Sequence, residues 1–343
     1  MTKNLLLSLL LTLPVHATEL GDLAASLAPG GWAVLNTIGF SKELIENGGS
    51  GSILTYADSA MWDSVRKKWF YLGAPHCGGV DCQKFIEYDD VTNTWTSCDG
   101  CPEDATGETW SHAYEHNAID VANQIWYHRN YGSERFQRFD LTTRGPWVDL
   151  QNIPLIVPQV AGALTFFQSR NEVYYLDGDR GLFVYDIAGG GWTKLSGKLD
   201  GTYSYHNFGE YNPVHDVMIL GGGNGSHAFY KIAADGTVSR QTDAPISLAV
   251  TDTIISVDPV SGKYLIWNTA GQFYEYDVVA DSWLQLSQGT MPVFNANSVE
   301  APIDTYGVVM FVRYQSTSSF VWIYKHSEST GSLVAPTNLR IGN

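Results

Sequence analysis

A repeated aromatic pattern constrains this chain more than any other feature of its sequence. An aromatic residue followed by Asp, with Trp seven or eight residues later, occurs as Tyr88-Asp89 with Trp95, Phe139-Asp140 with Trp147, Tyr185-Asp186 with Trp192, and Tyr276-Asp277 with Trp283. Tyr230 and Tyr324 keep the same phase in copies that lack the Trp. The six anchors follow one another at intervals of 45 to 51 residues, which is the length of one four-stranded blade. The pattern therefore predicts an all-β protein, a six-bladed β-propeller.

Turn signals repeat in the same phase as the aromatic anchors. Hairpin turns are expected at Asp63, Asp120, Gln168, Asn212, Asp258 and Asp304, each followed by a strand rich in aromatic and β-branched residues. The chain also has 34 glycines and 13% aromatic residues, a composition that suits many short strands joined by tight turns. Each hairpin is predicted to join the two innermost strands of one blade.

These residues resemble the Kelch repeat of galactose-oxidase-like propellers over about residues 30–327. The glycine pair of that repeat is complete only in the first and fourth copies, as Gly78-Gly79 and Gly221-Gly222. The resemblance implies that function lies on one face of the ring. That face is formed by the loops between the second and third strands of each blade and by the loops that lead from one blade to the next.

Residues 30–35 predict how the ring closes. The stretch Gly30–Leu35 has the character of an outer strand without a blade, and the last copy lacks the Trp expected after Tyr324. An N-terminal strand that completes blade six would remove the exposed sheet edges of an open ring. We therefore expect a propeller over residues 18–328. Residues 329–343 are expected to be a linker or the start of a truncated C-terminal β-sandwich module, because 334–341 is similar to the first strand of a fibronectin-type-III-like domain.

The first 17 residues have the pattern of a secretory signal peptide. Lys3 supplies the positive charge, Leu5–Leu13 is mostly apolar, and Val15 and Ala17 are the small residues expected before a cleavage site. The apolar run is too short to span a bilayer, and no later segment is long and apolar enough to do so. The mature protein is expected to be secreted or periplasmic.

The four cysteines lie close together in the sequence of the first blade. Their spacing is C-x4-C for Cys77 and Cys82 and C-x2-C for Cys98 and Cys101. Such spacing would suggest zinc in a cytosolic protein, whereas behind a signal peptide it favours two disulfides. Four cysteines allow three pairings, and the sequence does not choose among them.

The charge of the chain excludes one class of function. The formal net charge is −16, which opposes nucleic-acid binding, since that requires a basic surface. It also disfavours polyanionic substrates unless a local basic patch overrides the global field.

Histidines mark the candidate face. Of nine histidines, six are predicted to lie in or beside that face: His76, His112, His116, His128, His206 and His227. Blades two and four supply most of the polar residues there. One interpretation is that these side chains only join neighbouring blades by hydrogen bonds, because buried polar groups need partners. Their convergence on one face favours a functional site.

The residue types on this face suit a polysaccharide lyase that cleaves a uronic-acid-containing glycan. β-Elimination needs a group that neutralises the carboxylate, a base for the C5 proton and an acid for the leaving oxygen. Secreted propeller lyases acting on ulvan are similar in general architecture and in their use of His, Tyr and Arg, although they have more blades. His116 with Tyr205 or His206 are the predicted proton-transfer groups, and Arg129 with Asn117 the predicted neutralising pair. The predicted substrate-binding residues are His76, His112, His128, Tyr131, Arg180, Arg313 and Tyr314.

Other functions stay open. The lyase hypothesis requires no cofactor, although the histidines could hold structural zinc or calcium. A copper oxidase would need a Cys–Tyr pair that the sequence does not show. A non-catalytic propeller could bind glycan or protein, with Trp110, Trp126, Trp267 and Tyr314 as stacking surfaces. A glycosidase would need two facing carboxylates, and Glu115, Glu210, Asp252 and Glu300 are the candidates near inner strands.

Overall fold

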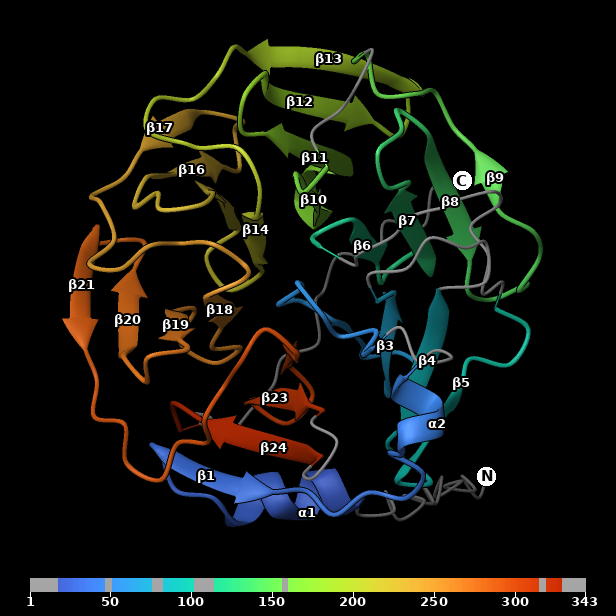
Figure 1. Cartoon of the computed structure of the whole chain (residues 1–343), viewed down its shortest axis with the longest axis vertical. Helices are drawn as coiled ribbons and strands as arrows, with labels where there is room; N and C mark the ends of the chain where they lie inside the picture. The colour runs from blue at the N-terminus through green and yellow to red at the C-terminus, as the bar shows by residue number, and fades with distance from the viewer. Residues whose placement is uncertain are drawn as a thin grey trace, which may run out of the picture.

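The computed structural model describes residues 18–46, 51–75, 83–101, 114–155, 160–314 and 319–328. Within these ranges six antiparallel four-stranded sheets surround one central axis (Figure 1). The prediction of a six-bladed propeller is confirmed. The predicted signal peptide and the predicted C-terminal segment lie outside the described residues.

The blades follow the chain in order, and each runs from an inner to an outer strand. Blade one contains β2 (Met61–Asp63), β3 (Lys68–Gly73), β4 (Lys84–Asp89) and β5 (Thr94–Ser97). Blade two contains β6 (Asn117–Asp120), β7 (Ile125–Arg129), β8 (Phe136–Asp140) and β9 (Val148–Asp149). Blade three contains β10 (Ala163–Phe167), β11 (Glu172–Asp177), β12 (Gly181–Asp186) and β13 (Gly191–Ser196), with the short 3-10 helix η1 (Gln168–Arg170) in its inner hairpin.

The second half of the ring has the same organisation. Blade four contains β14 (Asn207–Asn212), β15 (Val217–Gly222), β16 (Phe229–Ala233) and β17 (Val238–Arg240). Blade five contains β18 (Thr253–Val257), β19 (Tyr264–Asn268), β20 (Phe273–Asp277) and β21 (Ser282–Gln285). Blade six contains β22 (Ser298–Ile303), β23 (Val308–Arg313), β24 (Phe320–Lys325) and, as its outermost strand, β1 (Gly31–Val34). The helices α1 (Glu19–Ser26) and α2 (Lys42–Ile45) flank β1 in the sequence.

The repeated motif has a local structural cause. The Asp of each anchor ends the third strand, and its carboxylate accepts backbone N–H bonds from the turn that follows, as Asp89 does from Val91 and Thr92. The Trp comes back on the fourth strand directly opposite the anchor aromatic, as Trp95 does opposite Tyr88, where the ring centroids are 5.1 Å apart. The repeated pattern of an aromatic residue, Asp and Trp therefore has two causes: the Asp stabilises the turn, and the two aromatic rings pack together on the outer strands.

Closure by an N-terminal strand is confirmed. β1 pairs antiparallel with β24, and Trp32 lies opposite Tyr324 with ring centroids 4.4 Å apart. Trp32 thus occupies the position that Trp95 holds in blade one. In Figure 1 the blue β1 and the red β24 lie side by side at the rim, so the two ends of the propeller sequence share one sheet.

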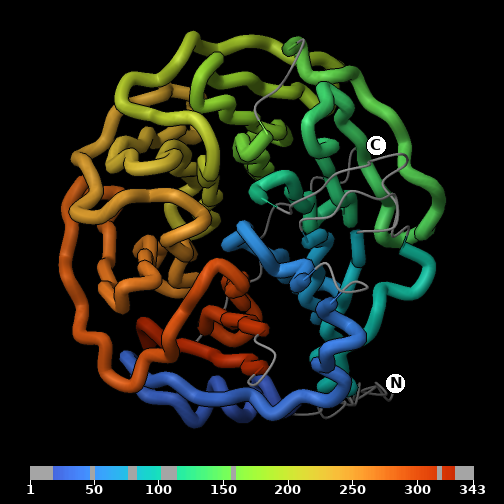
Figure 2. Tube along the Cα trace, in the orientation of Figure 1, coloured from blue at the N-terminus to red at the C-terminus, as the bar shows by residue number. Residues whose placement is uncertain are grey.

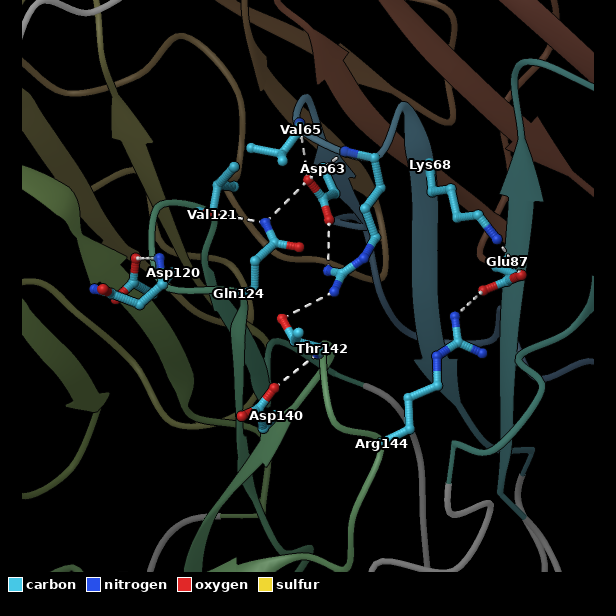
Figure 3. A network of polar contacts seen from close by, with 12 residues as sticks. Asp63, Val65, Lys68, Glu87, Asp120, Val121, Gln124, Asp140, Thr142 and Arg144 are labelled. Atoms are coloured by element: carbon cyan, nitrogen blue, oxygen red, sulfur yellow. Dashed lines mark hydrogen bonds and ion pairs between the residues drawn. The ribbon is translucent and has the colours of Figure 1, made fainter. Parts of the chain in front are cut away.

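Polar contacts join blades one and two on the hairpin side of the ring (Figure 3). The carboxylate of Asp63 accepts the backbone N–H of Val65 and also the side-chain amide of Gln124 from blade two. Farther out, Glu87 bonds both Lys68 of its own blade and Arg144 of blade two. The predicted inner hairpin turns are therefore also contacts between blades.

The cysteine prediction is resolved for one pair. Cys98 and Cys101 form a disulfide immediately after β5, whereas Cys77 and Cys82 lie outside the described residues. In the described part of the chain, none of the helices has the length and apolar character needed to cross a membrane.

Candidate functional site

Strained backbone marks the loop face. Tyr56, Tyr114, Tyr205 and His206 all have φ between 41° and 63°, a left-handed conformation that is uncommon for bulky residues. All four lie just before an inner strand, in loops that lead into blades one, two and four. The other non-glycine residues with positive φ lie in the tight hairpin turns within blades. Such strain is concentrated at functional sites, because ordinary packing gives no reason to retain it.

The four strained residues bring aromatic rings together at the loop end of the central channel. The chain before β2 runs from the rim to the centre of the ring (Figure 2), and there the Tyr56 ring stacks on His206 at 5.8 Å. Tyr114 lies 5.5 Å from His206 and stacks on Tyr131 of the β7–β8 loop at 6.1 Å. Tyr205 remains 45% exposed. We call Tyr56, Tyr114, Tyr131, Tyr205 and His206 the aromatic cluster.

Glycines fix the loop that carries Tyr205 and His206. A Cβ at Gly178 would lie 2.1 Å from the carbonyl oxygen of Tyr203, and a Cβ at Gly223 would lie 2.3 Å from the same atom. The Tyr203 N–H also donates to the carbonyl of Gly222. The glycine-rich turns after β11 and β15 therefore allow the close backbone approach that positions this loop.

His206 is held as a neutral imidazole with a defined tautomer. Its Nδ1 lies 2.6 Å from Oδ1 of Asn224, and an amide oxygen can only accept, so Nδ1 carries the proton and Nε2 has the lone pair. Burial lowers the pKa of His206, although the Asn224 bond and the charge of Asp252 act in the opposite direction. A neutral imidazole with Nε2 unprotonated is able to act as a general base.

Arg129 and His116 form a buried layer under the cluster. Arg129 is fully buried at the end of β7, where its Nη2 donates to the carbonyl of Val160 and lies 3.1 Å from Nε2 of His116. Its guanidinium also lies 5.2 Å from the ring centroid of Tyr175. The same His116 nitrogen is 2.8 Å from the Val160 carbonyl. Burial raises the pKa of Tyr114 and of Tyr131, and the positive charge of Arg129 lies near enough to oppose this increase in both.

Asn117 and His128 lie within blade two. Asn117 begins β6, donates to the Leu72 carbonyl of blade one, and accepts from Nε1 of Trp126. Nδ1 of His128 lies 2.8 Å from the same Asn117 oxygen, and its ring is 5.7 Å from that of Trp147. The structure therefore brings His116, Arg129, Tyr131, Tyr205 and His206 together near the channel end, and it places Asn117 and His128 deeper between strands.

The remaining predicted residues are dispersed. Arg180 pairs with Asp177 in the β11–β12 turn, Arg313 lies over the ring of Phe320, and the buried Tyr314 donates to Glu46. Nδ1 of His227 lies 2.7 Å from the Ala244 carbonyl. His76, His112 and Trp110 lie outside the described residues. Sugar stacking on Trp126 and Trp267 is a wrong prediction, because both indoles are buried in the packing between blades.

A layer of carboxyl groups crosses the channel below the aromatic cluster. Asp58, Glu115, Glu210 and Glu300 are all buried, and they come from blades one, two, four and six. Glu115 accepts the backbone N–H of Ser59, whose hydroxyl bonds Glu210 at 2.5 Å. Burial raises the pKa of Asp58, Glu210 and Glu300 well above the ordinary value, and the neighbouring carboxylates raise it further.

Below this layer the channel widens into a cavity of about 270 Å³ that reaches the hairpin side. Its walls are mainly apolar, with Trp62, Phe166 and Pro259 among the larger side chains. Its polar end is formed by Ser59, Glu115, Thr165 and Glu210. The channel thus has two chemically different ends, an aromatic one at the loop face and an acidic well that opens at the hairpin face.

Sequence reasoning did not select several residues of these sites. Tyr56, Asn224, Asp58 and Ser59 belong to no repeated motif. Tyr56 and Ser59 meet their partners across the ring, and Asn224 meets His206 from another loop of blade four. Their only sequence signal is position, since Tyr56 and Asp58 precede the first inner strand as Tyr114 and Glu115 precede the second. In the part of the chain that the structure describes, no three His, Cys, Asp or Glu side chains form a group able to hold a metal ion.

Comparison with known proteins identifies the fold of this chain but not its function. No protein-family model and no curated protein matches the sequence. A Bacteroides thetaiotaomicron protein of unknown function superposes with a TM-score of 0.54 at 10% identity, covering 88% of this chain and 73% of that one. A structure of a nidogen/laminin complex gives a TM-score of 0.49 at 10% identity over 67% of this chain and 79% of the other. At 10% identity the similarity to the Bacteroides protein supports the propeller fold alone, and the function must be argued from the site.

Proposed function

We propose that the loop face is a carbohydrate-active site that cleaves a uronic-acid-containing polysaccharide by β-elimination. The observation that carries the proposal is the state of His206. Its Nδ1 proton is engaged by Asn224, its Nε2 has a lone pair, and burial keeps the ring neutral. The exposed side chain of Tyr205 and the partly exposed Tyr131 lie in the same cluster.

The proposed reaction uses two proton transfers. Nε2 of His206 removes the C5 proton of the uronic acid, and the electron pair forms the C4–C5 double bond as the C4–oxygen bond breaks. The phenol of Tyr131 protonates the departing oxygen. Burial raises the pKa of Tyr131, so this phenol keeps its proton at neutral pH and can deliver it in the reaction. Exchange with water returns both groups to their starting states.

Arg129 supports the same reaction from below. The transition state carries additional negative charge on the uronate carboxylate, and a fixed positive charge in a site shielded from water stabilises it. Arg129 is the buried cation beneath Tyr114, held by the Val160 carbonyl and Tyr175. In this proposal it acts through its field, with His116 as the group that positions it.

Compartment and partner follow from the same proposal. The Cys98–Cys101 disulfide is typical of an oxidising compartment, which fits a secreted or periplasmic enzyme acting on polysaccharide outside the cytoplasm. The proposed reaction requires no cofactor. The net charge of −16 disfavours long polyanions in general, so the buried Arg129 is the local feature that favours an anionic sugar at this face.

The test is product formation with matched variants. Purified protein is incubated with a panel of uronic-acid polysaccharides, and the unsaturated product is followed by its ultraviolet absorbance. His206→Ala is expected to lower kcat by about 100-fold or more, the usual contribution of a general base. His215→Ala is the control, because His215 contacts the Ser261 carbonyl on the hairpin side. Equal turnover by the two variants would exclude His206 as the base.

A second candidate is non-catalytic glycan binding. The parallel stack of Tyr114 on Tyr131, with an interplanar angle of 12°, and the exposed Tyr203 and Tyr205 could serve as platforms for sugar rings. Glycan binding measured by calorimetry, without unsaturated product from any polysaccharide, would favour this function over the lyase.

A further inference from the structure

Thr18 lies at a junction between blade one and blade six, on the hairpin side of the ring. It is only 8% exposed, and its hydroxyl accepts the Gly21 N–H as the N-cap of α1. The same hydroxyl lies 3.1 Å from the phenol oxygen of Tyr306, in the β22–β23 hairpin of blade six. That phenol donates at 2.5 Å to Oδ2 of Asp90, the residue after β4 of blade one. One chain of polar contacts therefore joins the start of α1 to both blades that meet where the ring closes.

The carboxyl group at this junction lacks a cation. Asp90 is 1% exposed, and its Oδ1 has no hydrogen-bond partner among the described residues. In the same part of the chain, no Lys, Arg or His side chain forms an ion pair with it. Burial raises the pKa of Asp90, and the hydroxyls of Tyr306 and Thr18 and the charge of Lys67 oppose this increase. Because a buried carboxylate oxygen without a donor is costly, the junction has room for one more cationic partner.

Removal of the predicted signal peptide would create a cation at this point. The predicted cleavage site is the peptide bond between Ala17 and Thr18. Its hydrolysis by a signal-peptide-cleaving endopeptidase consumes one water, leaving a carboxylate on Ala17 and an α-ammonium on Thr18 at neutral pH. The α-nitrogen of Thr18 is three bonds from its own Oγ1, hence about 3 Å away. The new charge therefore arises within roughly two hydrogen-bond lengths of the Asp90 carboxylate.

The packing of α1 holds the Thr18 nitrogen at the junction. Leu20 is fully buried in the core that residues of blades one and six share. A Cβ at Gly21 would lie 3.0 Å from the Tyr306 ring, so the helix contacts this ring directly. Near the other end of α1, the Lys325 side chain of β24 donates to a helix carbonyl. The nitrogen that precedes this helix cannot move away from Asp90 without unpacking α1 from blade six.

We propose that cleavage after Ala17 stabilises the closed ring, because the α-ammonium of Thr18 then forms a buried ion pair with Asp90. Before cleavage the same nitrogen is an uncharged amide with a single N–H. After cleavage it has three donors and a positive charge, which supply the missing partner of the carboxylate. The ammonium opposes the dipole of α1, but Glu19 and Asp22 in the first turn offset this effect. The proposal goes beyond the loop-face chemistry and uses none of its residues.

The first measurement identifies the mature N-terminus. The full chain is produced in a host that exports it, and the exported protein is sequenced from its N-terminus. The first residue is expected to be Thr18. A mature chain that begins at any other residue, or that keeps residues 1–17, would overturn the proposal, because its α-ammonium would lie away from Asp90.

The second measurement compares two forms that differ only at the N-terminus. One begins at Thr18, and in the other two added alanines precede Thr18, so that its nitrogen is a neutral amide. The unfolding equilibrium constant of the extended form is expected to be larger by about tenfold or more. Asp90→Asn is expected to remove this difference. Asp89→Asn is the matched control and should retain it, because Asp89 accepts the turn N–H groups of Val91 and Thr92 instead.

A third measurement uses only the wild-type mature protein, so it does not depend on the folding of a variant. An amine-selective reagent at neutral pH is expected to label the α-amine of Thr18 at least about tenfold more slowly in the folded protein than in denaturant, because the paired ammonium is buried and keeps its proton. Equal labelling rates in the two states would overturn the proposal. Equal unfolding of the mature and extended wild-type forms, or a stability difference that persists in Asp90→Asn, would also overturn it.

Discussion

Nδ1 of His206 lies 2.6 Å from the side-chain oxygen of Asn224, so one hydrogen bond between two loops of blade four determines which imidazole nitrogen has the lone pair. Asn224 also donates its backbone N–H to the carbonyl of Tyr205. The side chain of Asn224 therefore fixes the tautomer of His206, and its backbone N–H holds the strained backbone of Tyr205. A base held in this way does not need to reorient before it takes a proton.

Replacing Asn224 should change the pH profile of the proposed lyase. Burial lowers the pKa of His206, so kcat/KM should rise with pH through a midpoint below about 6.5, the ordinary histidine pKa. Asn224→Asp places a negative charge beside the ring, favours the imidazolium, and should move this limb to higher pH. Asn224→Leu should lower kcat about fivefold, because a bond worth about 1 kcal/mol is lost. Superimposable pH profiles for Asn224→Asp and wild type would contradict the assigned tautomer.

The carboxyl layer should make the protein more stable in mild acid. The pKa values of Asp58, Glu210 and Glu300 are raised by folding, so the folded state holds more protons than the unfolded state above about pH 4. This stabilisation is complete below the unfolded pKa and is lost as pH rises through the folded values. Denaturant unfolding from pH 4 to pH 8 should show a falling free energy of unfolding.

Amide variants of the carboxyl layer isolate its contribution. Glu210→Gln with Glu300→Gln should flatten the pH dependence, whereas Glu134→Gln should not. Below pH 4 the opposite trend is expected from Asp277, whose pKa Lys263 lowers to about 2, because its ion pair is lost on protonation. The same slope above pH 4 in the double variant and in wild type would show that these carboxyl groups titrate alike in the folded and unfolded states.

Trp32 should contribute much of the stability that comes from closing the ring. Its ring packs against Trp267, Phe311 and Tyr324, with centroids 4.4 to 5.9 Å away. Trp32→Ala should lower the free energy of unfolding by about 3 kcal/mol, as expected for loss of a large packed aromatic. Val34→Ala, on the same strand but 41% exposed, should change it by less than about 0.5 kcal/mol. Similar denaturation midpoints for the two variants would mean that β1 contributes little to closure.

Arg129 should contribute to stability as well as to the proposed reaction. Arg129→Met keeps the aliphatic volume but removes the N–H that donates to the Val160 carbonyl and the guanidinium that lies over Tyr175. The free energy of unfolding is expected to fall by about 2 kcal/mol. Arg138→Met, an exposed substitution on β8, provides the comparison in the same denaturant titration. An unchanged midpoint for Arg129→Met would show that the buried guanidinium serves the loop face alone.

The fold could be predicted because each motif residue has a local function. An Asp that binds its own turn and a Trp that packs on the opposite aromatic repeat in four of the six copies, as Asp89 and Trp95 illustrate. Even the absence of a Trp after Tyr324 was informative, since Trp32 supplies it. An aromatic anchor that recurs six times, with its Asp and Trp in four of the copies, is visible in one sequence.

The candidate sites could be predicted only in part, because their contacts are not local. Tyr205 and His206 stood out by residue type, but Tyr56 meets His206 from blade one. Left-handed backbone at Tyr and His has no propensity signal, since glycine is the residue expected there. His128 was placed on the face from its loop neighbours, whereas in β7 it pairs with Asn117 inside the blade.

The pairing of β1 with β24 also has a consequence for the order of folding. Gly31 lies opposite Lys325 in the register of the pair, and the Gly30 N–H donates to the Lys325 carbonyl, so a growing chain cannot complete blade six until the last propeller strand has been synthesised. Contacts this distant in sequence cost more chain entropy to form than those within one blade, and topologies dominated by them fold slowly. Until that moment β1 lacks its partner strand, which makes the nearly finished chain the species most exposed to intermolecular strand pairing.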